Sequence, residues 1–167
     1  MNKLTINREE KEIMRRFIKK EFCRMYNIGI YNSLDILTIE NISNLIDLYD
    51  TYVLDKYLAQ VIPEGIRVST SNRMTSSGGK TIFSKVGRES KYEIRISNRI
   101  MKRFIEDDES KIVCGIEAED TLEALMLILE HEICHVIEFS KYGNSNCKGI
   151  RFKNIGRRVG RGRRETL

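Results

Sequence analysis

The sequence predicts an α+β fold in which a small, mainly antiparallel β-sheet packs against helices. Three observations lead to this prediction. Apolar residues recur at spacings of three and four in the N-terminal part of the chain and again in the C-terminal part, as in amphipathic helices. Between them, the segment 66–97 contains stretches that alternate apolar and polar side chains, which is typical of half-buried strands. Glycines at positions 78, 79 and 87 supply the turns between these stretches.

Size and composition favour one domain. The chain has 167 residues, 41% apolar and 32% charged, which is enough for one core and lies within the globular range. We therefore expect a single domain over 1–167, with an N-terminal helix and loop (1–37), a core (38–160) and a basic tail (161–167). No apolar run approaches the roughly 18 residues of a membrane span, and the N-terminus is too charged for a secretory signal.

The cysteines agree with a location inside the cell. The chain has four, and they are widely separated with no CxxC pair among them. This spacing resembles neither a disulfide framework nor a four-cysteine zinc site. The sequence thus predicts a cytoplasmic protein with reduced thiols and no membrane partner.

Two helices are predicted before the sheet. Over residues 8–26 the apolar positions follow helical spacing, with charged residues between them. These positions are Ile13, Met14, Phe17, Ile18 and Phe22. A second helix is predicted from about Thr38 to Gln60, ended by Pro63 and the glycine two residues later. We assign both helices a packing role.

The middle of the chain is predicted to hold about three strands, near 66–69, 81–86 and 92–97. A short helix around Asn98–Ile105 follows, and then an acidic loop over 106–110. Two further helices complete the prediction. One runs from about Asp120 or Thr121, a good N-cap, to Tyr142, with Gly143 at the C′ position, and the other starts near Gly149.

The helix predicted over 121–142 contains the run His131-Glu132-Ile133-Cys134-His135, an HExxH motif. Residues four apart lie on one helix face, so both imidazoles can bind one zinc ion at about 2.0–2.1 Å. Glu132, rotated away from the ion, can take a proton from zinc-bound water as general base. The alternative is two unrelated histidines beside a glutamate, but these are the only two histidines in the chain.

For three other residues in or near the motif, the sequence favours a structural role over a catalytic one. Cys134 is expected to be a packed small hydrophobe. Glu138 is expected to lie on a solvated face, although it could hydrogen-bond a ligand or a neighbouring arginine. For Tyr142 we expect packing rather than a role as an oxyanion donor.

Four segments in order carry a resemblance to a known family: SNRMTSSGGKT (71–81), YEIRISNRIM (92–101), LEALMLILEHEICHVIEF (122–139) and KGIRFKNIGRRVG (148–160). Together they resemble the SprT-like metallopeptidase domain, whose relatives include the bacterial SprT proteins and the DNA–protein crosslink protease Spartan. The resemblance implies a zincin-like fold, with a small antiparallel sheet packed on the zinc helix, and zinc-dependent endopeptidase activity. It matches His131 and His135 to the metal ligands and Glu132 to the catalytic base.

The third ligand departs from the family pattern. The family usually has a histidine in an HGxxF pattern, whereas here Lys148 precedes the Gly149–Phe152 match, and an ammonium group cannot bind zinc. We predict that the adjacent Cys147 takes this role, since a thiolate binds zinc at about 2.3 Å. The alternative is that Cys147 is an ordinary thiol and that zinc is bound weakly or lost.

Positive charge is concentrated at the C-terminal end. Residues 141–167 contain nine Lys and Arg and one acid, a net charge of +8, whereas the other 140 residues have a net charge of −3. This end suits a phosphate-bearing partner such as nucleic acid, and the alternative is a solvated tail. The sequence predicts a zinc-dependent metalloendopeptidase acting on protein substrates, DNA-associated ones included. The competing hypothesis is a non-catalytic or weakly metal-binding module for nucleic acid or protein.

Overall fold

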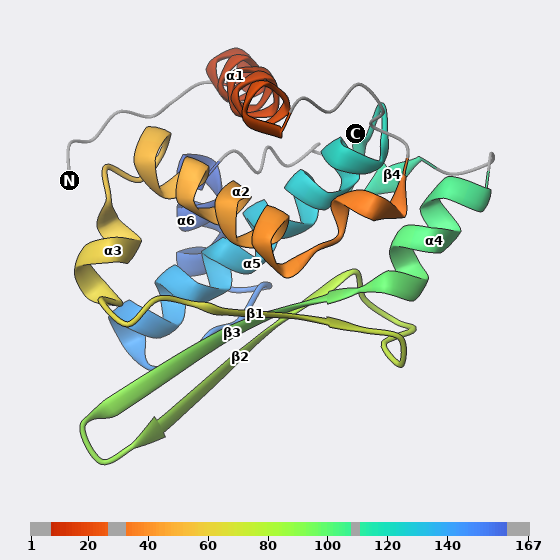
Figure 1. The fold of residues 1–167 in the computed structure, drawn as a ribbon. Helices are drawn as coiled ribbons and strands as arrows, with labels where there is room; N and C mark the ends of the chain where they lie inside the picture. Colours follow the sequence, from red (N-terminus) through yellow and green to blue (C-terminus); the bar gives the residue numbers. More distant parts are fainter. Residues whose placement is uncertain (1–7, 27–32, 108–110, 160–167) are drawn as a thin grey trace.

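One long helix, α5 (Thr121–Tyr142), lies at the centre of the fold. In this computed structural model, which describes residues 8–26, 33–107 and 111–159, α5 contacts α1, α2, α4, α6 and strand β2. Figure 1 shows the sheet along one side of α5 and helices α1 and α2 on the other. Buried side chains from α1 through α6 belong to one apolar cluster, so the described part of the chain has a single core.

Helix α5 has the bounds that its sequence predicts. The Asp120 carboxylate accepts a hydrogen bond from the Glu123 backbone N–H, and Gly143 ends the helix in the left-handed conformation at φ 71°. From Ala124 to Glu138 every residue is buried except His131 and His135, which are partly exposed. A helix that is buried all round is a core helix, and over residues 124–138 this one is open to solvent only where the two histidines lie.

Helix α1 (Arg8–Tyr26) is also confirmed, but its buried face differs from the predicted one. Ile18 and Phe22 are fully buried, whereas Ile13 and Phe17 are 58% and 39% exposed. On the same face, Arg15 lies one turn before Ile18 and Lys11 two turns before it. Both cations are buried, with 6% of each residue exposed. These cations reach polar partners on α5 and α6, so charge as well as apolar burial holds α1 in place.

The single helix predicted over 38–60 is two helices, α2 (Ile39–Tyr52) and α3 (Tyr57–Val61). The buried Asp50 carboxylate explains the break, because it accepts hydrogen bonds from the backbone N–H groups of Leu58 (2.8 Å) and Ala59 (3.0 Å). The carboxylate thereby caps the start of α3. In one continuous helix Asp50 would lie more than two turns from Leu58, too far for this contact. Lys56, before α3, takes a left-handed conformation at φ 61°.

The sheet contains β1 (Arg67–Ser71), β2 (Gly79–Val86) and β3 (Glu89–Ser97) in the order β1-β3-β2. The prediction of a mainly antiparallel sheet is wrong in part: β2 pairs with β3 antiparallel, but β1 pairs with β3 parallel. The β2–β3 hairpin inserts β3 into the middle, and β3 then runs in the same direction as β1. The α+β class is confirmed, and β2 is left at one edge of the sheet.

The remaining elements complete the chain. Helix α4 (Asn98–Glu106) follows β3 as predicted. The last helix, predicted to start near Gly149, is α6 (Ile150–Val159). The sequence did not indicate the turn η1 (Leu34–Ile36) or the hairpin of β4 (Ile112–Val113) and β5 (Ile116–Glu117). The tail predicted at 161–167 lies outside the described residues. None of the helices in the described ranges combines the length and apolar character needed to cross a membrane.

Candidate metal centre

The two histidines of the motif converge. His131 and His135 lie one turn apart on α5, and their Nε2 atoms are 3.1 Å apart. The ring of Phe152, from α6, packs against both imidazoles, with centroid distances of 5.1 Å to His131 and 4.5 Å to His135. Two aromatic nitrogens directed at the same point match the donor set that zinc takes from an HExxH helix.

The Glu132 side chain points toward the sheet. It is only 4% exposed, and its Oε2 accepts a hydrogen bond of 2.8 Å from the Thr81 hydroxyl on β2. This contact joins residues that are 51 positions apart in the sequence. The hydroxyl restrains the orientation of the Glu132 carboxylate, next to His131 in the sequence.

Gly79 allows this close approach of strand and helix. A Cβ atom at position 79 would lie 2.7 Å from Cγ2 of Ile128 and 2.8 Å from Cγ of Glu132. At Gly78 a Cβ would lie 2.6 Å from Cδ1 of Ile128. The sequence suggested that these glycines form a turn, but their lack of side chains is what lets β2 lie against α5. In the sequence, the adjacent glycines at 78 and 79 were the feature from which this close approach of β2 to α5 could have been predicted.

Glu138 is buried, not solvated as expected, with 1% of its surface exposed. Its Oε2 accepts hydrogen bonds from the Ser145 hydroxyl (2.6 Å) and from the Asn146 backbone N–H (2.8 Å). Its Oε1 lies 3.5 Å from Nε of Arg151. Ser145 Oγ in turn lies 2.6 Å from Nδ1 of His135, so a chain of polar contacts connects Glu138 to the His135 ring.

The loop between α5 and α6 is held by its own polar side chains. Arg151 donates a 2.7 Å hydrogen bond to the Asn144 side chain, and its guanidinium lies 4.3 Å from the Tyr142 ring centroid. Tyr142 therefore contacts an arginine at the surface and is itself 49% exposed. The Lys148 backbone N–H donates to the Asn146 side chain at 3.0 Å.

Cys147 and Lys148 are both exposed in this loop. Within residues 8–26, 33–107 and 111–159, no three His, Cys, Asp or Glu side chains form a group that could hold a metal ion. The structure thus brings together His131 and His135 from the predicted ligand set, but not Cys147. None of the four cysteines, all of which lie in the described ranges, forms a disulfide, and Cys134 is fully buried, as expected for a packed small hydrophobe.

The basic C-terminal end lies partly on α6. Arg151, Arg157 and Arg158 are exposed on this helix, whereas the arginines at 161, 163 and 164 lie outside the described residues. Val159, at the end of α6, is 1% exposed. The helix therefore turns a cationic face to solvent and an apolar face to the core.

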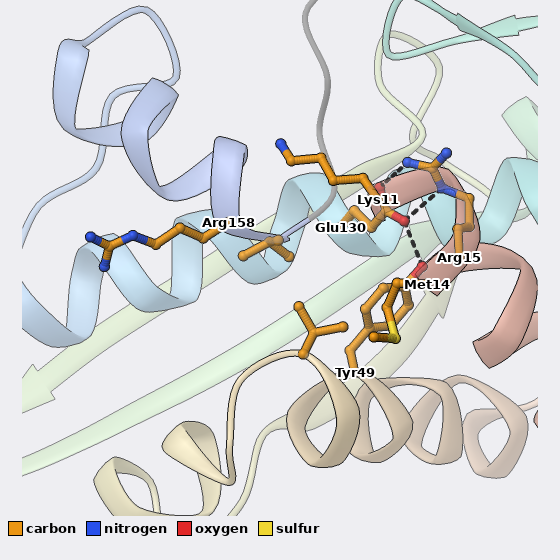
Figure 2. Close-up of a pocket in the computed structure, with 8 residues that line it drawn as sticks. Lys11, Met14, Arg15, Tyr49, Glu130 and Arg158 are labelled. Carbon is orange, nitrogen blue, oxygen red and sulfur yellow. Dashed lines mark hydrogen bonds and ion pairs between the residues drawn. The ribbon is translucent and has the colours of Figure 1, made fainter. Parts of the chain in front are cut away.

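A second polar cluster surrounds Glu130, next to the motif in sequence (Figure 2). Its carboxylate accepts two 2.8 Å hydrogen bonds from Arg15 and one of 2.6 Å from the Tyr49 hydroxyl. Burial, then the charge of Glu130, raises the pKa of Tyr49 well above its ordinary value. Burial lowers the pKa of Arg15, but the hydrogen bonds and charge of Glu130 outweigh it and raise the pKa overall. Sequence reasoning missed this cluster.

The Glu130 cluster borders a small pocket between α1, α2, α5 and α6. The pocket is lined by Lys11, Met14, Arg15, Tyr49, Val53, Glu130, Arg158 and Val159. None of the predicted zinc-site residues lines it. Lys11 connects α1 to α6 beside this pocket, because its ammonium group donates a 3.2 Å hydrogen bond to the Gly156 carbonyl.

The chain was also compared with known proteins. No protein-family model, curated protein or solved structure matches it.

Proposed function

We propose that this protein is a zinc-dependent metalloendopeptidase that cleaves protein substrates. The observation that carries the proposal is the convergence of the His131 and His135 Nε2 atoms, 3.1 Å apart, on the partly exposed side of a buried helix. Polar rings at such a position favour a bound ion over a packing role. The adjacent Glu132 adds a buried carboxylate held in one orientation.

His131 and His135 would hold the ion, because imidazole nitrogens are typical zinc ligands. Zinc held there would act as a Lewis acid: it would polarise a peptide carbonyl and lower the pKa of a water to about 7. Glu132 acts as the general base that takes the proton from the attacking water and passes it to the leaving amine. The Thr81 hydroxyl holds the carboxylate ready for this transfer, because its hydrogen bond restrains the Glu132 rotamer.

The position of β2 supports a peptide substrate. β2 is an edge strand with β3 on one side only, and it carries Thr81, the partner of Glu132. An extended polypeptide can add to such an edge through backbone hydrogen bonds. A chain bound there runs alongside the general base, which agrees with cleavage inside a polypeptide rather than with action on a small molecule.

The test is metal content together with hydrolysis of an unstructured protein such as casein. We expect about one zinc per chain after purification without added metal, and loss of most of it in His135→Ala. Glu132→Gln should keep the zinc and lose hydrolysis, because an amide cannot accept the proton. Glu123→Gln, on the same helix, is the matched control. Wild-type turnover in Glu132→Gln would contradict the mechanism, and stoichiometric zinc in His135→Ala would contradict the site.

A second candidate is a nucleic-acid-binding module with little or no bound metal. It is favoured by the exposed Arg151, Arg157 and Arg158 on α6 and by Lys148 in place of a ligand. Binding of this kind is electrostatic, so about four or five phosphate contacts give a log–log salt slope of roughly −4 on duplex DNA. The same end could also direct the peptidase to DNA-associated substrates.

A salt titration against duplex DNA tests the second candidate. We compare the full chain with Arg157→Gln/Arg158→Gln and with a chain ending at Val159, since an earlier end would remove buried α6 residues. Both variants should bind more weakly and with a shallower salt slope. Unchanged affinity and slope in both would exclude the basic end as a nucleic-acid surface.

A further inference from the structure

We propose that Glu138, acting through Ser145, is a positioning residue that fixes His135 in the tautomer needed to bind a metal. The inference deepens the proposed function and rests on it. Its basis is the polar chain from Glu138 Oε2 to Ser145 Oγ (2.6 Å) and from Ser145 Oγ to His135 Nδ1 (2.6 Å).

The direction of the two hydrogen bonds follows from the number of protons. A carboxylate only accepts, so the single hydroxyl proton of Ser145 goes to Glu138. The Ser145 oxygen then faces His135 as an acceptor, and Nδ1 of His135 must carry the proton. In a neutral imidazole this leaves the lone pair on Nε2, the atom that lies 3.1 Å from Nε2 of His131.

The surroundings of Glu138 hold this arrangement in place. The carboxylate is 1% exposed, and it also accepts from the Asn146 backbone N–H at 2.8 Å. The guanidinium of Arg151, 3.5 Å away, compensates its charge. Glu138 lies one turn after His135 on the same rigid helix, so the distance between them is fixed, and the loop residue Ser145 fills the space between their polar atoms.

A fixed tautomer has a direct consequence for metal binding. In water a free histidine side chain favours the proton on Nε2, which blocks the atom that faces His131. Ser145 reverses that preference before any ion arrives, so His135 needs no rearrangement to bind. Partners of this kind typically change metal affinity by about 10–100-fold.

The experiment combines zinc affinity with the imidazole nitrogen shifts of the zinc-free protein. The shifts are recorded by ¹⁵N NMR at about pH 8.5, well above the usual His pKa of about 6.5. The chain has two histidines, so His131→Gln assigns the signals. We expect an Nδ1–H tautomer for His135 in the wild type and in Ser145→Thr, which keeps the hydroxyl. Ser145→Ala and Glu138→Met, which has no oxygen to accept the Ser145 proton, should move the signal toward the Nε2–H tautomer.

Zinc affinity, measured by competition with a chromophoric chelator, should fall about 10–100-fold in Ser145→Ala and be kept in Ser145→Thr. Ser140→Ala is the matched control, because that hydroxyl contacts Tyr57 and the Ile137 carbonyl instead. An Nε2–H tautomer in the wild type, or an unchanged tautomer in Ser145→Ala, overturns the proposal. An effect of Ser145→Ala without one of Glu138→Met overturns the part assigned to Glu138. If the wild type takes up no zinc, the proposed function fails, and the tautomer still decides the role of Ser145.

Discussion

Gly79 of β2 lies directly against Glu132 of α5. A Cβ at position 79 would lie 2.8 Å from Cγ of Glu132 and 2.9 Å from its Oε1. Both separations are shorter than van der Waals contact, so only glycine lets the strand come this close. The same approach brings the Thr81 hydroxyl to 2.8 Å from Oε2 of Glu132. The edge strand therefore sets the position of the carboxylate that we assign as general base.

We expect Gly79→Ala to lower the free energy of unfolding by about 1–3 kcal/mol, because the added methyl group pushes β2 away from α5. Urea denaturation measures this loss, and hydrolysis should fall with it because Glu132 is displaced. Lys80→Ala is the matched control, since the neighbouring Lys80 side chain is exposed. Equal unfolding midpoints for the two variants would contradict the close approach.

The third zinc ligand stays a prediction. If Cys147 binds zinc, X-ray absorption of the zinc form shows a sulfur scatterer at about 2.3 Å, and Cys147→Ala removes it and weakens binding. Cys114→Ala, at another exposed cysteine, should do neither. A first shell of nitrogen and oxygen alone excludes the thiolate. Lys148→His then tests the position at which the resemblance to SprT-like domains places a histidine, and the introduced imidazole should raise zinc affinity.

The buried ion pair between Arg15 and Glu130 should be a major anchor of α1. Arg15→Ala leaves the Glu130 carboxylate buried without its cation, and we expect a loss of about 3–5 kcal/mol in the free energy of unfolding. Arg16→Ala changes an exposed cation of the same helix and should alter stability little. Chemical denaturation compares the two variants, and similar midpoints would mean that the pair does not hold α1.

Tyr49 should make the protein sensitive to alkali. Its pKa in the folded protein is raised above the usual value of about 10, so folding is favoured while the phenol is protonated. That contribution is complete below about pH 10 and is lost as the pH rises further, because the unfolded chain gives up the proton first. The slope is about 1.4 kcal/mol per pH unit for one proton.

Denaturation between about pH 9 and 11 measures this dependence. Tyr49→Phe cannot ionise at this position, so its stability should fall less steeply over the same range. Burial also raises the pKa values of Tyr26 and Tyr92. Their contribution to the dependence of stability on pH should therefore remain in Tyr49→Phe. The same slope in wild type and Tyr49→Phe would contradict the assignment.

Local signals were sufficient for the helix that carries the motif. Asp120, the apolar repeat and Gly143 all act within a few residues of α5, so its bounds could be read directly. The separation of four between His131 and His135 likewise fixes their common face on any helix. The α+β class follows from the change in apolar period along the chain.

Contacts between distant segments were not predictable in this way. Arg15 is 115 residues from Glu130, and no helical period distinguishes a cation that pairs in the core from one in solvent. Asp50 breaks the predicted helix because of where the chain folds back to meet it, which the pattern of apolar residues does not record.

The sequence by itself determined the motif helix, the nature of its polar groups and the class of fold, because these depend on short-range periodicity and capping. Only the tertiary structure decided that β1 runs parallel to β3, that Glu138 is buried beside Ser145, and that Cys147 lies apart from the histidines. Each of these depends on how separate elements pack. Packing is set by the shape and charge of surfaces that meet only after folding, so the neighbouring sequence cannot specify it.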